Sequence, residues 1–246
     1  MNLVIDWGNS SLKLGWFAGP VLIHTQSIAS PDDLSALVAE QPIGHVIVSS
    51  TSRPADELRN RVNTMGGADW LTLDGTTPVP ISKQYDTPHT LGADRVAAAV
   101  GATVLFPGRD CLVVDLGTCI TADLVDAGLV FQGGLIAPGV QMRFRAMHTF
   151  TERLPLVEVG EGWPALTARS TREAMRSGVL NGMLFELEGV IDAYRQRYPN
   201  LVVLVCGGDA PLFESRLKPT IFAVPELVLV GLNRILAHNV KDLQVE

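Results

Sequence analysis

Two short stretches place an aspartate at the end of an apolar run and a glycine two residues later. Residues 3–10 read LVIDWGNS and residues 112–119 read LVVDLGTC, with Leu, Val, Asp and Gly in matching columns. A glycine after a strand lets backbone amides approach a ligand, and successive amides in a tight turn form an anion-binding concavity. Both stretches are therefore candidate phosphate-binding turns.

The first turn carries further groups that suit a nucleotide phosphate. Asn9, Ser10 and Ser11 add side-chain hydrogen-bond donors. Lys13 supplies a positive charge, and Asp6 could hold Mg²⁺ that bridges to phosphate oxygens. The same residues are also typical of an ordinary hairpin turn, so this stretch alone leaves both interpretations open. No Walker A loop or GxGxxG pattern is present in the sequence.

A third candidate is Gly92-Ala93-Asp94-Arg95, where a polar loop ends and a helical run begins. An acid in the first helical turn is stabilised by the helix dipole. The Asp94 carboxylate could accept the proton of a hydroxyl that attacks a γ-phosphate, and Arg95 could bind a substrate carboxylate or phosphoryl charge. The alternative is a helix cap beside a surface arginine, and position alone does not decide between them.

Strands and helices that must position these groups alternate along the chain. Residues 74–91 are expected to form a loop. Strands are expected at 3–7, 12–17, 21–27, 45–50, 112–115, 120–125, 129–132 and 201–206. Helices are expected at 31–40, 55–65, 92–106 and 225–238, and in two pieces within 167–198. This order predicts an α/β fold with mixed sheets.

The echo between the two Asp-x-Gly stretches favours a duplicated architecture. Each copy places an aspartate at a strand end with a hairpin-like strand behind it. We therefore expect two repeated halves, residues 1–110 and 111–246, each contributing one turn to a cleft between them.

Composition limits the function classes. The 246-residue chain is 47% hydrophobic and 18% charged, which is typical of a folded protein with a sizeable core. A formal net charge of −7 argues against a nucleic-acid partner. Cys111, Cys119 and Cys206 have no paired spacing, which favours a reducing compartment. With no signal peptide or run that could span a bilayer, we expect a cytoplasmic protein without a membrane partner.

The motifs together resemble those of the type III pantothenate kinases, which have the acetate and sugar kinase/Hsp70/actin fold. Residues 6–13, DWGNSSLK, are similar to that family's DxGNTxxK loop. GADR at 92–95, with Tyr85 ahead of it, matches the substrate motif, and VVDLGT at 113–118 resembles VDxGT. GGLIAPG at 133–139, Ser170-Thr171 and CGGDA at 206–210 follow in the family's order.

The resemblance implies two ribonuclease H-like (actin-like ATPase) domains and a homodimer. It implies the ATP-dependent phosphorylation of pantothenate to 4′-phosphopantothenate, the first step of coenzyme A biosynthesis, with Mg²⁺ and a monovalent cation, K⁺ or NH₄⁺. Residue by residue, it implies Asp94 as the base and Asp115 as the ligand of the monovalent cation. The ATP-binding residues would be Asp6, Trp7, Gly8, Asn9, Ser10, Ser11, Leu12, Lys13 and Thr118. The pantothenate-binding residues would be Tyr85, Gly92, Ala93, Asp94, Arg95 and Thr171.

Two departures from the family pattern stand out. Ser10 replaces the commoner Thr but keeps the hydroxyl, whereas Cys206 replaces a Thr and loses it. Two alternatives stay open: a kinase of this fold acting on another small hydroxylated substrate, and a non-catalytic regulatory or accessory protein. The intact Asp94 and Lys13 speak against the second.

Overall fold

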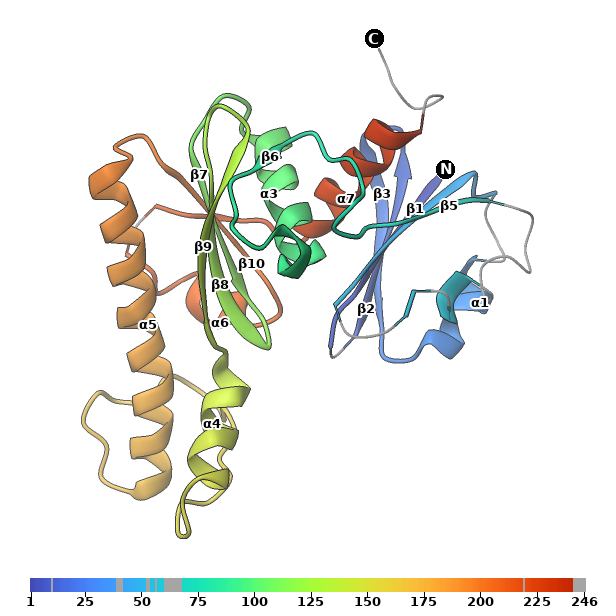
Figure 1. The fold of residues 1–246 in the computed structure, drawn as a ribbon. Helices are drawn as coiled ribbons and strands as arrows, with labels where there is room; N and C mark the ends of the chain where they lie inside the picture. Colours follow the sequence, from blue (N-terminus) through green and yellow to red (C-terminus); the bar gives the residue numbers. More distant parts are fainter. Residues whose placement is uncertain are drawn as a thin grey trace. The chain divides into compact units, whose positions relative to one another are not determined.

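A computed structural model describes residues 1–9, 11–38, 42–51, 54–55, 57–59, 68–218 and 220–240 (Figure 1). Ser10 and most of the helix expected at 55–65 lie outside these ranges. The chain forms two compact units. Unit 1 consists of Met1–Gly108, Val125–Gly133 and Glu226–Glu246, and unit 2 consists of Arg109–Leu124 and Gly134–Pro225. The division into halves at 1–110 and 111–246 stays a prediction.

The sheet of unit 1 has five strands in the order β3-β2-β1-β4-β5. β1 pairs antiparallel with β2 and parallel with β4, so the sheet is mixed as expected. The four predicted strands of this region are confirmed to within about two residues, and β5 was not predicted. The bounds are β1 Asn2–Trp7, β2 Leu12–Ala18, β3 Val21–Ile28, β4 His45–Ser50 and β5 Asp69–Thr72.

A short helical segment covers one face of this sheet. It begins with the 3₁₀ turn η1, Pro31–Asp33, and continues as α1, Leu34–Val38. The Ser30 hydroxyl accepts a hydrogen bond from the Asp32 N–H at 3.2 Å and so caps the start. Leu34 and Val38 then pack against the sheet in the same core cluster as the side chains of β1.

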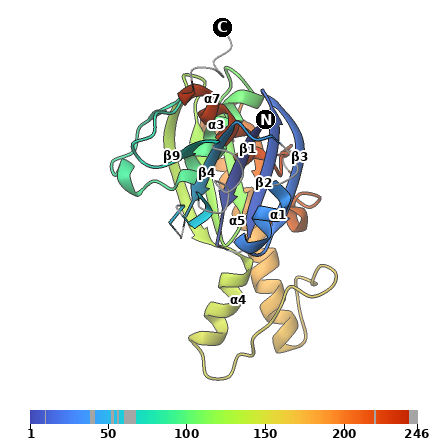
Figure 2. The same cartoon turned by 90° about the vertical axis from the view of Figure 1, so that its right-hand side faces the viewer.

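Two helices from distant parts of the sequence pack together in unit 1 (Figures 1 and 2). They are α3, Ala93–Leu105, and α7, Leu227–Asn239, and α7 also contacts β1, β2 and β4. A Cβ atom on Gly101 would overlap the Leu227 carbonyl oxygen, and one on Gly231 would overlap that of Ala97. Backbone therefore meets backbone, and this packing explains the apolar sequence of α3.

The loop that leads into α3 contains two short elements. β6, Ser82–Lys83, pairs parallel with Val130 and Phe131 at the start of β9, and the 3₁₀ turn η2, Pro88–Thr90, lies just before α3. The expected loop at 74–91 is thus confirmed in outline, with one fixed strand pairing inside it.

Unit 2 is built on strands in the order β11-β10-β7-β8-β9. β10 runs parallel to both β7 and β11. Val125 of β8 and the first residues of β9 are counted with unit 1. The strands are β7 Cys111–Leu116, β8 Cys119–Val125, β9 Val130–Pro138, β10 Val202–Cys206 and β11 Phe222–Ala223.

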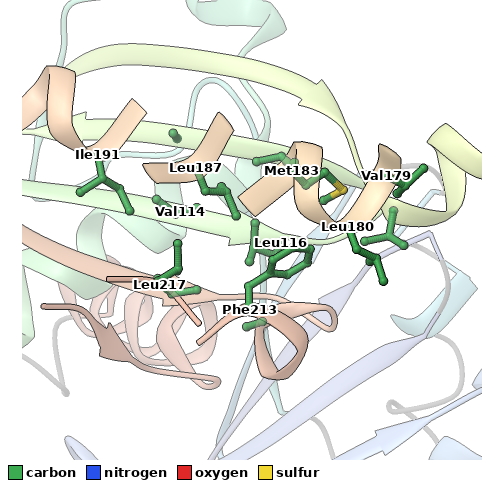
Figure 3. Close-up of a cluster of buried hydrophobic side chains, with 14 of the residues drawn as sticks. Val114, Leu116, Val179, Leu180, Met183, Leu187, Ile191, Phe213 and Leu217 are labelled. Atoms are coloured by element: carbon green, nitrogen blue, oxygen red, sulfur yellow. The ribbon is translucent and has the colours of Figure 1, made fainter. Parts of the chain in front are cut away.

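The main helix of unit 2 is α5, Thr171–Arg197, which is one continuous element of 27 residues. The expectation of two pieces was wrong, because glycines at 178, 182 and 189 interrupt the apolar pattern without breaking the helix, and the helix contains no proline. Figure 3 shows the core that α5 makes with β7 and the segment after β10, with Leu180, Met183 and Leu187 facing Leu116 and Phe213.

Two further helices complete unit 2. α4, Val140–Thr149, was not predicted; it continues from the end of β9 and lies beside α5 (Figures 1 and 2). α6, Ala210–Phe213, follows β10. Across the described ranges, no helix combines the length and the apolarity that crossing a membrane requires.

Candidate active site

The first Asp-x-Gly stretch forms the expected hairpin in unit 1. The Gly8 N–H donates to the Ser11 carbonyl oxygen at 3.1 Å, and Asp6 stands in register with Lys13 on β2. The Thr51 N–H donates to the Trp7 carbonyl oxygen at 3.4 Å, so the carboxyl ends of β1 and β4 lie side by side. The loop therefore presents Asp6 and Lys13 at one edge of the sheet.

Not every residue of this loop offers its side chain to a ligand. Trp7 and Leu12 are buried in the core of unit 1, so only their backbone is available. Asn9 is exposed, whereas Asp6 and Lys13 are half-buried. Gly8 does not have a positive φ, and among the residues that the structure describes a Cβ atom there would meet only the Ser11 carbonyl oxygen, at 3.6 Å. The special backbone freedom expected of this glycine is therefore not used.

The second stretch forms a turn between β7 and β8 in unit 2. The Gly117 N–H donates to the Cys119 carbonyl oxygen at 3.0 Å, Thr118 is exposed, and Asp115 stands in register with Cys206 on β10. Gly117 also lacks a positive φ. In both turns, then, the glycine N–H donates to a carbonyl oxygen two or three residues later, and the glycine has no positive φ.

Two other segments bring their backbone close to this turn, and one of them lies against the Asp115 carboxylate. Gly207 has φ +94°, and a Cβ atom there would lie 2.5 Å from Asp115 Oδ1 and from the Leu116 nitrogen. A Cβ atom on Gly139 would overlap the Gly117 carbonyl oxygen. Only glycine fits at both places, so the GGxIxPG-like and CGGDA segments belong structurally to this turn.

Asp209 is a residue of this cluster that sequence reasoning did not select. Its N–H donates to the Leu116 carbonyl oxygen at 2.8 Å, and burial raises the pKa of its carboxyl group. The CGGDA motif contained the signal, but only the packing of residue 209 against β7 distinguishes it from a solvent-facing turn aspartate.

The substrate motif begins α3 in unit 1. Gly92 occupies the N-cap position, and Asp94 Oδ1 accepts a hydrogen bond from the Arg95 N–H at 2.9 Å. A Cβ atom on Gly92 would lie 2.5 Å from that same Asp94 oxygen. The glycine therefore leaves the space in which the carboxylate folds over the start of the helix.

Arg95 is not the surface residue that the alternative interpretation required. It is 7% exposed, and its Cζ lies 5.8 Å from the ring centroids of both Tyr85 and Phe131. The two rings are 6.0 Å apart in an edge-to-face arrangement. The structure thus brings Tyr85 and Arg95 together as a cation–π cluster next to Asp94.

A cavity of about 260 Å³ opens beside this motif within unit 1. Gly92 and Ala93 form one side, and Lys83 and the ends of β4 and β5 form the others. Asp94, Arg95 and Tyr85 are not among its lining residues. Thr171 belongs to unit 2, where it is the exposed first residue of α5 after the Ser170 cap.

The described residues contain no cluster of three or more His, Cys, Asp or Glu side chains that could hold a metal ion. Asp6 and Asp115 each stand in a different unit.

Comparison with known proteins identifies the family and supports the fold. The sequence profile described as type III pantothenate kinase matches residues 2–193. A type III pantothenate kinase from Cytophaga hutchinsonii is 49% identical over 241 residues, covering 98% of this chain and all of the relative.

Two solved structures share the fold at low sequence identity. A Baf family protein from Campylobacter jejuni is 19% identical with a TM-score of 0.63, covering 96% of this chain and 98% of the other. A ROK family glucokinase from Streptomyces griseus, in complex with glucose and AMPPNP, is 12% identical with a TM-score of 0.54, covering 97% and 99%. The fold is thus the α/β fold of the sugar kinases and actin-like ATPases, and this chain belongs to the type III pantothenate kinase family.

Proposed function

We propose that this protein transfers the γ-phosphoryl group of ATP to the primary hydroxyl of pantothenate, giving 4′-phosphopantothenate and ADP, the first step of coenzyme A biosynthesis. The observation that carries the proposal is the GADR helix start, where Asp94 follows directly on two residues that line a cavity and precedes the buried Arg95, which contacts Tyr85. Identity of 49% to a named type III pantothenate kinase over nearly the whole chain supports it.

Asp94 acts as the base in this proposal. Its Oδ1 accepts a hydrogen bond from the Arg95 N–H, which fixes the position of the carboxylate at the start of α3. An ionised, oriented carboxylate accepts the proton of the attacking hydroxyl. Phosphoryl transfer needs little covalent chemistry from the protein, so positioning and charge neutralisation are the main tasks of the remaining residues.

The two Asp-x-Gly turns would bind the phosphates. The backbone of the exposed Asn9 and the Lys13 ammonium suit phosphate oxygens, and Thr118 offers an exposed hydroxyl on the second turn. Asp6 fits a Mg²⁺ site, because that ion is held by one or two carboxylates together with substrate phosphates. When bound, the ion neutralises charge on the phosphate oxygens.

The Asp115 carboxylate would hold the monovalent cation, K⁺ or NH₄⁺. This assignment is supported by the close approach of the Gly207 backbone, which leaves Asp115 half-buried and restricts the space around its carboxylate. Thr171, exposed at the start of α5, would contribute its hydroxyl to pantothenate. A cytoplasmic location is consistent with the lack of a disulfide among the described cysteines.

The direct test is ADP release by purified protein with ATP, Mg²⁺ and K⁺, which should depend strictly on pantothenate. Asp94→Asn should lower kcat by about 10²- to 10⁴-fold while ATP binding and the thermal midpoint stay unchanged. Asp192→Asn, a matched change at an exposed position of α5, should keep full turnover. Pantothenate-independent ADP release would refute the proposed function, and near-normal turnover of Asp94→Asn would remove the base role.

A homodimer is part of this proposal, with α5 as its contact. Ala174, Gly178, Gly182 and Phe185 line an open groove on α5, and Phe185 is 53% exposed. A Cβ atom on either glycine would meet no atom within 4 Å, although a helix-interior glycine costs about 1 kcal/mol relative to alanine. A closely approaching helix of a second copy would account for both glycines.

The dimer is tested by light scattering coupled to size-exclusion chromatography. Gly178→Leu should fill the groove and give monomers that still fold, because the added side chain points into open space. Gly189→Leu is the matched control: it is also open, but it does not line the groove. Equal effects of both variants, or none, would contradict this interface.

A further inference from the structure

One buried hydroxyl of unit 1 lacks a hydrogen-bond partner. Ser49, near the carboxyl end of β4, is 0% exposed, and its Oγ meets no donor or acceptor within the part of the chain that the structure describes. Proteins pair nearly all such groups, because an unpaired hydroxyl in the interior lowers stability. A serine that departs from this rule is a candidate for a role in ligand binding.

Ser49 continues a row of polar residues across three adjacent strands. Asp6 on β1 stands in register with Lys13 on β2 at one side and with Ser49 on β4 at the other. Residues in register project from the same face of a sheet, and neighbouring strands lie about 4.8 Å apart. One side-chain rotation therefore brings the Ser49 hydroxyl within hydrogen-bonding reach of the Asp6 carboxylate.

The row lies on the sheet face that packs against α7. On this face the Asn2 side chain donates to Asn233 Oδ1 at 3.1 Å, and a Cβ atom on Gly15 would meet Leu229 Cδ1 at 3.3 Å. Asn2 and Gly15 share the face with the row because side chains alternate along a strand. Asn233 also donates to the Gly19 carbonyl oxygen at 2.9 Å, so this polar residue of α7 is already engaged away from Ser49.

Ser49 can influence a ligand only through a neighbour, because its own side chain is fully buried. Asp6 is that neighbour: it is half-buried and lies at the start of the first turn. A serine hydroxyl offers a carboxylate one O–H donor, and a carboxylate held in this way keeps one orientation. Hydrogen bonds of this kind are often long or unmade in a ligand-free site and form in the complex.

We propose that Ser49 is a positioning residue for ATP binding, whose hydroxyl donates to the Asp6 carboxylate once the phosphates occupy the first turn. The inference rests on the proposed function and adds to it a residue that orients Asp6 towards MgATP. A hydroxyl that is paired only in the complex lowers the stability of the free protein and raises the affinity for the nucleotide. An ordinary core serine has neither effect.

Ser49→Ala tests the proposal, because it removes the hydroxyl with little change in volume. Without ligand, its thermal midpoint should equal that of the parent protein or exceed it by about 2–4 °C. Its Kd for MgATP, from calorimetric titration without pantothenate, should rise about 10- to 100-fold, and KM for pantothenate should stay unchanged. A lowered midpoint or an unchanged Kd would overturn the proposal.

Trp16→Phe is the matched control. Trp16 Nε1 is also buried without a partner in the described residues, but Trp16 packs in the core cluster with Leu34 of α1, on the opposite face of the same sheet. This variant should bind MgATP with the parent Kd. A loss equal to that of Ser49→Ala would show a general effect of the core and overturn the specific role.

A double-mutant cycle tests whether Ser49 acts through Asp6. Asp6→Ala should weaken MgATP binding, and Ser49→Ala added to that variant should cause no further loss. A further loss as large as in the parent protein would show that Ser49 acts on another group and would overturn the proposal.

Measuring ADP release alongside binding separates this inference from the proposed function. Pantothenate-dependent release with a Kd for MgATP that ignores Ser49→Ala would overturn the role of Ser49 alone. MgATP binding that responds as expected, without pantothenate-dependent release, would overturn the proposed function and keep the inference. Absence of both binding and release would overturn both.

Discussion

The turn after β1 and the turn after β7 carry the same Asp-x-Gly pattern, yet they are enclosed in different ways. Around Gly8, within the described part of the chain, a Cβ atom would make one ordinary contact, at 3.6 Å from the Ser11 carbonyl oxygen. Around the second turn, Gly207 lies against the Asp115 carboxylate and Gly139 against the Gly117 carbonyl oxygen, each so closely that no side chain fits. Sequence similarity between the turns therefore does not extend to their packing.

The difference suggests a division of labour. The first turn leaves Asn9 exposed and the Lys13 side chain partly exposed, which suits a ligand that enters and leaves with every turnover, such as nucleotide phosphate. A turn closed by backbone fixes one carboxylate in a defined space, which suits a cation that is retained. The glycines that matter most for structure are thus outside the repeated motif.

The largest expected effect is on stability. Gly207→Ala should lower the free energy of unfolding by about 3 kcal/mol or more, because φ +94° is strained for alanine and its Cβ would meet backbone at 2.5 Å. Gly8→Ala should cost less than about 1 kcal/mol. Urea unfolding of both variants provides the measurement, and equal losses would break the comparison between the turns.

The second-largest effect is expected on kcat, in the variant Gly92→Ala. The added Cβ would lie 2.5 Å from Asp94 Oδ1 and displace the carboxylate, and misplacement of a reacting group by about 1 Å can cost on the order of 100-fold in rate. We expect kcat to fall by about that factor while the urea midpoint changes little. A variant with normal kcat would show that the observed carboxylate position is not the reactive one.

The two aspartates should differ in which ion they control. Asp6→Asn should raise the Mg²⁺ concentration for half-maximal activity by about tenfold and leave the K⁺ requirement unchanged. Asp115→Asn should do the reverse. Activity titrated separately with each salt measures both, and an effect of either variant on both ions alike would contradict the division of labour.

The smallest expected effect is on the reactivity of the cysteine thiols. Burial raises the pKa of the Cys111 thiol to about 11, so about one molecule in a thousand carries its thiolate at pH 8. Cys206 is buried too, whereas Cys119 in the second turn is half-exposed. A thiol reagent should therefore label one cysteine of the native protein, Cys119→Ser should abolish labelling, and Cys111→Ser should not. Rapid labelling of Cys111 would indicate that β7 opens readily.

The sequence was sufficient for elements whose hydrophobic period is strong and whose ends carry turn residues. β1, β2, β4, β7, β10, α3 and α7 all belong to this group. The continuity of α5 was missed because three glycines mask its period, and helix stability there comes from packing on the core of unit 2. α4 and β5 are short and weakly patterned.

The site could be predicted only where a motif is contiguous. The hairpin at Asp6–Lys13 and the GADR helix start follow from local residue order. The closure of the second turn by Gly139 and Gly207, the stacking of Arg95 on Phe131 and the cavity beside Lys83 depend on which distant segments meet. Hydrophobic periodicity within one segment carries no information about contacts between distant segments, so the sequence alone does not predict these contacts.

The contact between α3 and α7 has a consequence for synthesis. Unit 1 receives its last helix from residues 227–239, whereas unit 2 is complete once residue 225 has been made. During translation, the face of the unit 1 sheet that α7 covers therefore stays exposed until nearly the whole chain has left the ribosome. In a nascent chain stopped before residue 227, unit 1 should bind a chaperone that recognises exposed apolar surface, or should be cut by added protease. Unit 2 of the same chain should already be folded and resist the protease.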